Sequence, residues 1–254
     1  MNPYENLAKK FADRSVVKGT TMTLINEPLL IPKMKRADLD FLVFDMEHGR
    51  YDCQDILPML AMCRYNQIPT IVRVQDSLYH LIAKTIDMGA DGIMLPRTET
   101  VEQLRTAVDA IRFYPIGRKG CGGTQQFRPG ENFDEFQRGR LLMPQIESPL
   151  GIENLPAMIA GFKDQLAGIM IGPYDMSIML GTPLDIASVP MTDAIKKVFD
   201  ICITAGVSVG CYCDNPEKAL YYRSMGSNIF WTGGDTGFFL SGLNKMMDEL
   251  KAVK

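Results

Sequence analysis

The chain has 254 residues, of which 46% are hydrophobic and 22% are charged, and its formal net charge is -3 at pH 7. This size and composition are ordinary for a globular protein with a large apolar core. The charge argues against a nucleic-acid-binding protein, because it supplies no excess of cations for phosphate groups. No apolar run approaches the roughly 20 residues needed to cross a membrane.

Eight short apolar segments recur along the chain with the spacing of strand-plus-helix units. They predict strands at Thr20–Leu24, Phe41–Asp45, Thr70–Val74, Gly92–Leu95, Leu141–Ile146, Gly168–Ile171, Val207–Cys211 and Asn228–Trp231. Stretches with helical periodicity separate them, and Thr100 with Gln103 predicts a capping box at the start of one helix. Eight strands alternating with helices favour an α/β fold, a single (β/α)8 TIM-barrel domain over residues 1–254.

The six cysteines show no paired C-x-x-C spacing, and a chain of this length needs no disulfides. Cys211 and Cys213 alternate along a predicted strand, so both sulfur atoms should face one side, where we interpret them as core residues. Residues 1–6 lack the basic and apolar regions of a secretion signal. We therefore expect a cytoplasmic protein with reduced thiols.

One long segment interrupts the alternation of strands and helices, from Tyr114 to Arg140. Its glycine-rich part, residues 117–130, holds five glycines and one proline. Long insertions after a barrel strand are usually functional loops or subunit contacts, and the alternative is a mobile surface loop.

The predicted strand Phe41–Asp45 ends in the sequence Asp45-Met46-Glu47-His48-Gly49. Two carboxylates and an imidazole at the carboxyl end of a parallel strand lie where α/β barrels keep their catalytic groups. The chain has only two histidines, so His48 is a candidate for proton transfer near neutral pH. A polar turn without a chemical role is the alternative. His80, on a predicted helix, is interpreted as a surface residue.

Arg73 lies within the apolar strand Thr70–Val74, where an unpaired guanidinium would be costly to bury. At the mouth of a barrel it could hold a carboxylate or a developing oxyanion. A structural salt bridge is the alternative.

Two further strands end in polar residues. Gln145 and Glu147 alternate and should face the same side, and Asp175 follows Gly172, which permits close approach of the backbone. Glu147 and Asp175 suit a hard divalent cation such as Mg²⁺ or Mn²⁺. They could instead form a general acid/base pair, as in glycoside hydrolysis. The turn from Gly172 to Asp175 favours a small keto acid over a sugar ring.

Five segments now appear in the right order for a known family. They are Phe44–His48, Val72–Val74, Met88–Pro96, Gln145–Glu147 and Ile171–Ser177. In these segments the chain resembles the HpcH/HpaI class II aldolases, which include 4-hydroxy-2-oxoheptanedioate and 2-keto-3-deoxy sugar-acid aldolases. The resemblance covers roughly residues 20–239 and implies a TIM barrel of the phosphoenolpyruvate/pyruvate type.

The resemblance also implies an activity. The enzyme would reversibly cleave a 4-hydroxy-2-oxo acid to pyruvate and an aldehyde, with pyruvate chelating a divalent metal (Mg²⁺, Mn²⁺ or Co²⁺) held by Glu147 and Asp175. His48 matches the family's general base, and Arg73 matches its enolate-stabilising Arg. Asp87 matches an Asp that raises the basicity of this His.

Other implied roles concern substrate and assembly. Asp45 would be a second partner of His48. Gln145 and the backbone at Tyr174 and Asp175 would hold the pyruvate portion, next to Gly172. The family also exchanges its last helix between subunits, so the resemblance implies a homo-oligomer, a hexamer built as a trimer of dimers.

Departures from the family pattern and alternative functions stay open. Tyr174 is bulkier than the residue often found at this position, and Lys119 and Cys121 interrupt an expected Arg-Gly pattern, which leaves the aldehyde open. The same site could serve a decarboxylase or an acyl-CoA lyase, although no clear basic cluster for CoA phosphates is present. A keto-acid binding protein is the non-enzyme alternative. No Lys stands at a predicted strand end, which disfavours a Schiff-base mechanism.

Overall fold

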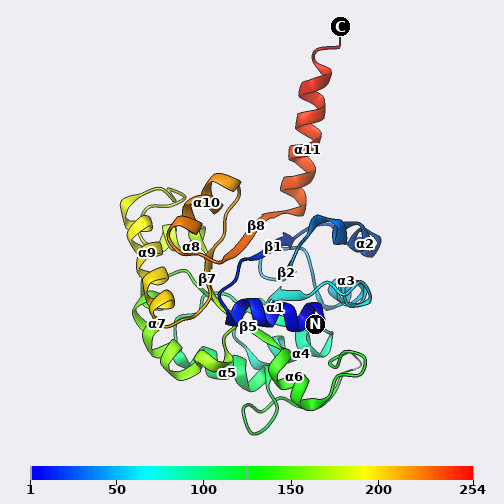
Figure 1. Cartoon of the computed structure of the whole chain (residues 1–254), viewed down its shortest axis with the longest axis vertical. Coiled ribbons are helices and arrows are strands. Elements are labelled where there is room, and N and C mark those ends of the chain that lie inside the picture. The colour runs from blue at the N-terminus through cyan, green and yellow to red at the C-terminus, as the bar shows by residue number, and fades with distance from the viewer. Residues whose placement is uncertain (1, 124, 254) are drawn as a thin grey trace.

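The computed structural model describes residues 2–123 and 125–253, in which eight parallel strands close into a barrel in sequence order (Figure 1). The strands are β1 (Val17–Met22), β2 (Phe41–Asp45), β3 (Thr70–Arg73), β4 (Gly92–Leu95), β5 (Leu141–Ile146), β6 (Ile169–Ile171), β7 (Val209–Cys211) and β8 (Ile229–Gly234). The predicted (β/α)8 barrel is therefore confirmed. The first strand is displaced from its prediction because it pairs with β8 from Val17 onward.

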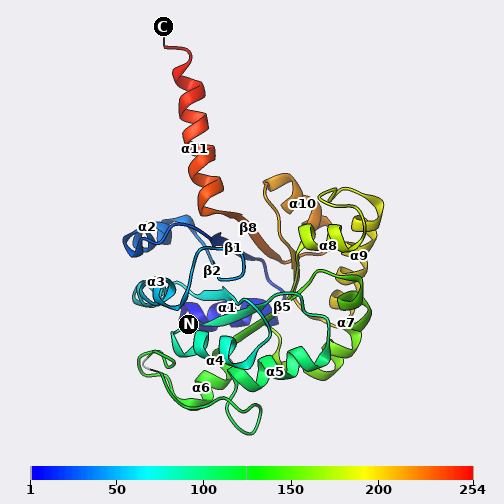
Figure 2. The same cartoon turned by 180° about the vertical axis from the view of Figure 1, so that it is seen from behind.

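Helices surround this barrel (Figure 2). The α-helices are α1 (Pro3–Ala12), α2 (Ile31–Met34), α3 (Cys53–Tyr65), α4 (Tyr79–Asp87), α5 (Val101–Ile111), α6 (Phe133–Gly139), α7 (Pro149–Phe162), α8 (Pro173–Met179), α9 (Val189–Thr204), α10 (Pro216–Ser224) and α11 (Asp235–Leu250). Three short 3-10 helices are η1 (Pro28–Leu30), η2 (Lys35–Ala37) and η3 (Lys163–Gln165). The predicted capping box of Thr100 and Gln103 starts α5. Among the described residues, no helix is both long enough and apolar enough to span a membrane.

Two apolar cores follow from the period-two alternation along the strands. The outer core lies between strands and helices and contains both Cys211 and Cys213, as predicted. The inner core fills the barrel with side chains such as Val43, Ile71, Met143 and Ile229, and α1 adds Leu7 and Phe11 to it. Because the inner core fills the amino-terminal part of the barrel, inward-facing residues further along each strand are left at the carboxyl-terminal mouth.

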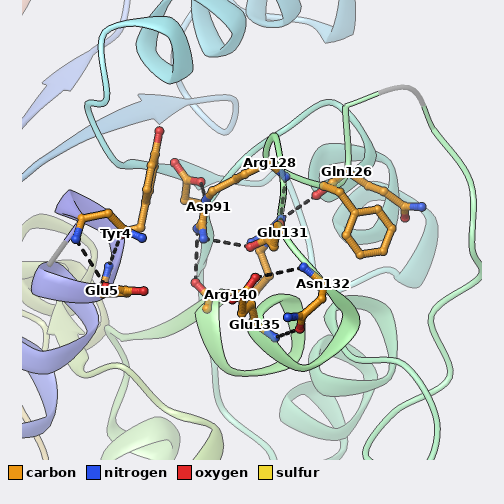
Figure 3. A network of polar contacts seen from close by, with 12 residues as sticks. Tyr4, Glu5, Asp91, Gln126, Arg128, Glu131, Asn132, Glu135 and Arg140 are labelled. Carbon is orange, nitrogen blue, oxygen red and sulfur yellow. Dashed lines mark hydrogen bonds and ion pairs between the residues drawn. The ribbon is translucent and has the colours of Figure 1, made fainter.

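The long segment between Tyr114 and Arg140 follows α5 and precedes β5, so it lies at the amino-terminal end of the barrel. The expectation that it follows a strand is wrong, because a helix lies between β4 and this segment. A buried ion network fixes it (Figure 3): Arg128 Nε lies 2.9 Å from Asp91 Oδ1, and Arg140 Nη2 lies 2.7 Å from Glu131 Oε2. The Arg128 guanidinium also stacks on Tyr4 of α1 at 4.0 Å.

Helix α11 is set apart from the others. Figures 1 and 2 both show it extending away from the barrel. It exposes a series of large apolar side chains, namely Phe238, Phe239, Leu240, Leu243, Met246, Met247 and Leu250. A helix of a soluble barrel normally buries such a face against a neighbouring element.

Candidate active site

A cavity of about 720 Å³ opens at the carboxyl-terminal mouth of the barrel. Its lining includes Thr21, Asp45, Arg73, Gln145, Tyr212 and Trp231, which continue the inward-facing rows of β1, β2, β3, β5, β7 and β8. The cavity is also lined by His48, Gly172 and Asp214 from the segments that follow the strands, and by Tyr174 and Asp175 from the first turn of α8. Parallel strands therefore bring together residues from distant parts of the sequence, and most of the candidate residues predicted from the sequence are among them.

Arg73 is held at the floor of this cavity by a two-pronged contact with Asp45. The two residues are register partners on β2 and β3, and Asp45 accepts from Arg73 Nε at 2.9 Å and from Nη2 at 2.6 Å. The third nitrogen, Nη1, lies 3.2 Å from Glu47 Oε2. Burial lowers the pKa of Arg73, but these carboxylates outweigh it and raise the pKa overall, so the guanidinium stays charged. The salt bridge considered as the alternative role of Arg73 is therefore present, and it also fixes the Arg73 guanidinium where it faces the cavity.

The turn that carries His48 depends on Gly49. A Cβ atom on Gly49 would come within 2.2 Å of the Asp45 carbonyl oxygen, so only glycine fits this close turn. Asp45 Oδ1 accepts from the backbone N–H groups of Glu47 at 3.0 Å and of His48 at 3.2 Å. The imidazole itself is 62% exposed, with Nε2 located 3.7 Å from Glu47 Oε2. Asp45 therefore shapes the turn and holds Arg73, and its contact with His48 is through the backbone.

Glu147 and Gln145 face the same side of β5, as predicted. Gln145 Nε2 donates to Glu147 Oε2 at 2.7 Å, and the backbone N–H of Arg97 donates to Glu147 Oε1 at 2.7 Å. A Cβ atom at position 172 would lie 2.0 Å from Glu147 Oε2, so Gly172 is required for the carboxylate to occupy this place. Glu147 borders a second hollow of about 360 Å³, and Asp175 lines both hollows.

The electrostatics around Glu147 fit a divalent cation. Burial, together with the negative charges of Asp175 and Glu47, raises the pKa of Glu147 to about 7. Gln145 Oε1 is buried and accepts no hydrogen bond within the described part of the chain. Two carboxylates and a free amide oxygen are donors that hard cations prefer. In residues 2–123 and 125–253 no three His, Cys, Asp or Glu side chains cluster as a metal site, so other ligands would be substrate or water.

Comparison with known proteins decides the family. The pattern of the family described as HpcH/HpaI aldolase/citrate lyase matches residues 23–241. The chain belongs to this family. It is 29% identical over 225 residues to a protein of Salmonella gallinarum named 2-keto-3-deoxy-L-rhamnonate aldolase, with 85% of this chain and 82% of that protein covered.

Solved structures of other HpcH/HpaI proteins share the fold. The HpcH/HpaI aldolase from Desulfitobacterium hafniense superposes with a TM-score of 0.87 at 23% identity, and 96% of each chain is covered. A family protein from Burkholderia cenocepacia gives a TM-score of 0.89 at 23% identity, with 97% of this chain and 99% of that chain covered. The chain is accordingly an enzyme of the lyase class on an HpcH/HpaI barrel.

Three of the residues considered from the sequence do not line the cavity of this HpcH/HpaI barrel: Glu147, which borders the second hollow, and Asp87 and His80. Asp87 ends α4 at the amino-terminal end of the barrel, where Lys119 Nζ donates to it at 2.5 Å. Among the described residues of this chain, no contact supports an effect of Asp87 on the basicity of His48. His80 is exposed near the start of α4, in agreement with its interpretation as a surface residue.

Sequence analysis missed several residues that shape the cavity. Tyr212 lies between Cys211 and Cys213, and since those sulfur atoms face the outer core, Tyr212 had to face the barrel interior. Trp231, the one tryptophan of the chain, lies two residues after Ile229 and so shares its inward direction. Its Nε1 donates to Thr21 Oγ1. The alternation rule could have found both aromatic residues.

Asp235 was also missed, because it acts through backbone groups that leave no sequence pattern. At the start of α11 its Oδ2 accepts from the N–H groups of Thr23, Leu24 and Ile25, the last two at 2.9 and 2.7 Å. Thr23 Oγ1 donates to Oδ1 at 2.7 Å. Asp235 thus ties the loop after β1 to the end of β8 and fixes one side of the cavity mouth.

Replacing Asp235 by Ala is expected to lower the free energy of unfolding by about 2–4 kcal/mol, because backbone donors lose a charged acceptor. Burial raises the pKa of Asp235, but the hydrogen bonds outweigh it and lower the pKa overall. Its contribution is present above the pKa of an unfolded Asp, about 4, and disappears as pH falls further. Urea unfolding at pH 7 and at pH 3 measures both effects. Asp200→Ala on the exposed face of α9 serves as control, and an equal loss for Asp235→Ala at the two pH values would contradict the account.

Proposed function

We propose that this enzyme reversibly cleaves a 4-hydroxy-2-oxo acid to pyruvate and an aldehyde, with a divalent cation at Glu147 and Asp175. The observation that carries the proposal is the convergence of Arg73, His48 and Asp175 on one cavity at the mouth of the barrel. The relative from Salmonella gallinarum is named for an activity of this kind. When bound, the cation would supply Lewis-acid polarisation of the keto oxygen.

The residues of the chain account for the movement of protons and charge. In cleavage, His48 takes the proton of the C4 hydroxyl, directly or through water, as the C3–C4 bond breaks. The bonding electrons move towards C3 and the keto oxygen, and the fixed guanidinium of Arg73 stabilises the charge that develops there. The aldehyde leaves, and C3 takes up a proton to give pyruvate.

Gln145 and the turn from Gly172 to Asp175 are proposed to hold the pyruvate portion. All four proposed residues of this set, Gln145, Gly172, Tyr174 and Asp175, line the cavity. The orphaned Gln145 Oε1 offers a polar atom to a small ligand, and the absence of a Cβ at Gly172 lets the Glu147 carboxylate lie beside it. Which of Mg²⁺, Mn²⁺ or Co²⁺ occupies the site stays a prediction.

The deciding experiment measures pyruvate release from a panel of 4-hydroxy-2-oxo acids in Mg²⁺, Mn²⁺ or Co²⁺. We expect turnover with metal and none in chelator. Oxaloacetate and acyl-CoA substrates belong in the panel, and turnover of one of these alone would redirect the assignment to a decarboxylase or an acyl-CoA lyase. The second is disfavoured, because His48 and Arg73 are the only cavity-lining side chains in the described residues that can carry a positive charge.

A positive charge at position 73 should not be enough for activity without the guanidinium of Arg73. Arg73→Lys is expected to lose most activity while still binding pyruvate, because Lys cannot make the two-pronged contact with Asp45 and reach the substrate as well. Arg73→Ala should lower kcat by about 10²-fold or more, as for other lost oxyanion donors. Steady-state kinetics, pyruvate titration and a melting temperature for each variant test this. A near-normal kcat with only a raised KM would make Arg73 a substrate clamp.

We also propose that α11 packs against a second copy of the chain, in a homo-oligomer. The support is its projection from the barrel and its exposed apolar side chains, among them Phe239, Leu243 and Met247. Sedimentation should show an oligomer, and Leu243→Glu with Met247→Glu should shift it towards smaller species. A monomeric wild-type protein would contradict the proposal. The hexamer and a cytoplasmic location stay predictions.

A further inference from the structure

One wall of the cavity is built from three aromatic rings that begin beside Arg73 and run outward. The Arg73 guanidinium lies 5.5 Å from the centroid of the Trp231 ring. Trp231 and Tyr212 have centroids 5.0 Å apart, and Tyr212 and Tyr174 have centroids 6.1 Å apart. Trp231 is 4% exposed and Tyr174 is 39% exposed, so the wall leads from the end of the cavity beside Arg73 to its opening. An aldehyde fragment that extends outward from pyruvate at Arg73 would lie along it.

A carboxylate stands at the outer end of this wall. Asp214 lines the cavity and accepts from the hydroxyl of Tyr174 at 3.3 Å. Lys218 Nζ, which is not part of the cavity lining, donates to the same carboxylate at 2.9 Å, and Asn215 Nδ2 donates to it at 2.8 Å. Burial raises the pKa of Asp214, but the contacts with Lys218 outweigh it and hold the pKa below its ordinary value. The cavity thus meets an ionised carboxylate whose cationic partner lies behind it.

The charges around the cavity decide what this wall can accept. Asp45, Asp175 and Asp214 line it, whereas His48 and Arg73 alone among the described lining residues can be cationic. Arg73 is held by Asp45 and Glu47 at the pyruvate end of the cavity, where the proposed mechanism uses it. An aldehyde with a terminal carboxylate would meet Asp214 while Lys218 already pairs with that carboxylate and lies outside the cavity lining, and such a juxtaposition of like charges disfavours binding.

A neutral hydroxylated aldehyde can instead form hydrogen bonds with the wall. A carboxylate has about four lone-pair positions and can accept from substrate hydroxyl groups besides its present donors. The Tyr174 hydroxyl can accept from a second substrate hydroxyl while it donates to Asp214. The aromatic faces of Tyr174 and Tyr212 offer apolar contact to the carbon skeleton between these groups.

We propose that Tyr174, Tyr212 and Asp214 form the acceptor subsite and select neutral hydroxylated aldehydes against aldehydes that carry a carboxylate. This inference rests on the proposed lyase function and adds the class of the aldehyde to it. It also gives a role to Tyr174, which is bulkier than the residue often found at this position in the family.

The test runs the reaction in the direction of synthesis, with metal-loaded enzyme, pyruvate and two aldehydes, glyceraldehyde and succinic semialdehyde. The measured quantity is the ratio of kcat/KM for the two aldehydes within one protein, so effects on the pyruvate half cancel. We expect wild type to favour glyceraldehyde at least about tenfold, and Asp214→Asn to reduce this ratio about tenfold by removing the repulsion. Tyr174→Phe should reduce the ratio by lowering kcat/KM for glyceraldehyde, while kcat/KM for succinic semialdehyde should stay unchanged. Tyr221→Phe, on exposed α10, is the matched control and should keep the wild-type ratio.

Exchange of the C3 protons of pyruvate for deuterium, without aldehyde, reports the pyruvate half independently. If wild type catalyses this exchange but prefers succinic semialdehyde, or if Asp214→Asn keeps the wild-type ratio, the inference is overturned and the lyase function stands. If wild type shows neither exchange nor condensation with either aldehyde, the proposed function fails and the inference fails with it.

Discussion

Glu147→Gln and Asp175→Asn are expected to abolish metal-dependent pyruvate release, because each removes one of the two carboxylates proposed to hold the cation. Both substitutions keep the shape of the side chain, and the amide introduced by Glu147→Gln would keep an oxygen near the Arg97 N–H group. The loss should therefore come from charge, since hard cations bind weakly without anionic oxygen ligands. Calorimetric titration with Mn²⁺ should show the loss of binding directly.

A matched control and chelation complete this test. Glu102→Gln removes a carboxylate from the exposed face of α5 and should leave activity and Mn²⁺ binding at wild-type levels. Chelator should stop turnover of the wild type without changing its circular dichroism, because apolar side chains fill the barrel core. Full activity in chelator, or in either carboxylate variant, would rule out the cation at this place.

The fold was predictable because its signals are local and repeated. Strands such as Phe41–Asp45 and Leu141–Ile146 are apolar on both faces, as parallel strands in a barrel must be, and their bounds match the prediction. The first strand was misplaced because Lys18 to Thr21 is largely polar. Its position is set by pairing with β8, a contact more than 200 residues away in sequence.

The site was predictable where residues follow strands, and less so where loops and other helices complete it. Asp45, Arg73 and Gln145 follow from the alternation along β2, β3 and β5. The partnership of Asp45 with Arg73 needed the register of two strands, which sequence periodicity does not give. Asp214 could not be found in this way, because the role proposed for it depends on its hydrogen bond with Tyr174, which follows another strand.

The resemblance to the family reached further than these physical arguments, and the role that it implies for Asp87 stays a prediction. That residue matches the family in sequence, yet in this chain it lies at the other end of the barrel and binds Lys119. A match of residue type along the sequence does not by itself show that the residue makes the same contact within one chain. Contacts formed between subunits would leave the same sequence signal as contacts within one.

His48→Ala is expected to lower kcat by roughly 10²–10⁴-fold while pyruvate still binds, the range typical for a lost general acid–base group. The imidazole is 62% exposed, and Asp45 holds the turn through the backbone N–H of residue 48 rather than through the ring. Its removal should therefore spare stability and the cation. Glu47, 3.7 Å away, can orient the ring and offset its charge when it carries a proton.

Two further measurements separate a base from a residue that only shapes the cavity. Because the site of the missing ring is open to solvent, added imidazole should restore part of the lost kcat in His48→Ala, as an external base can enter the space. His80→Ala, which removes the other histidine from the exposed face of α4, should keep wild-type kcat and gain nothing from imidazole. If the two variants behave alike, or if His48→Ala changes only KM, proton transfer at the C4 hydroxyl belongs to another group of the cavity.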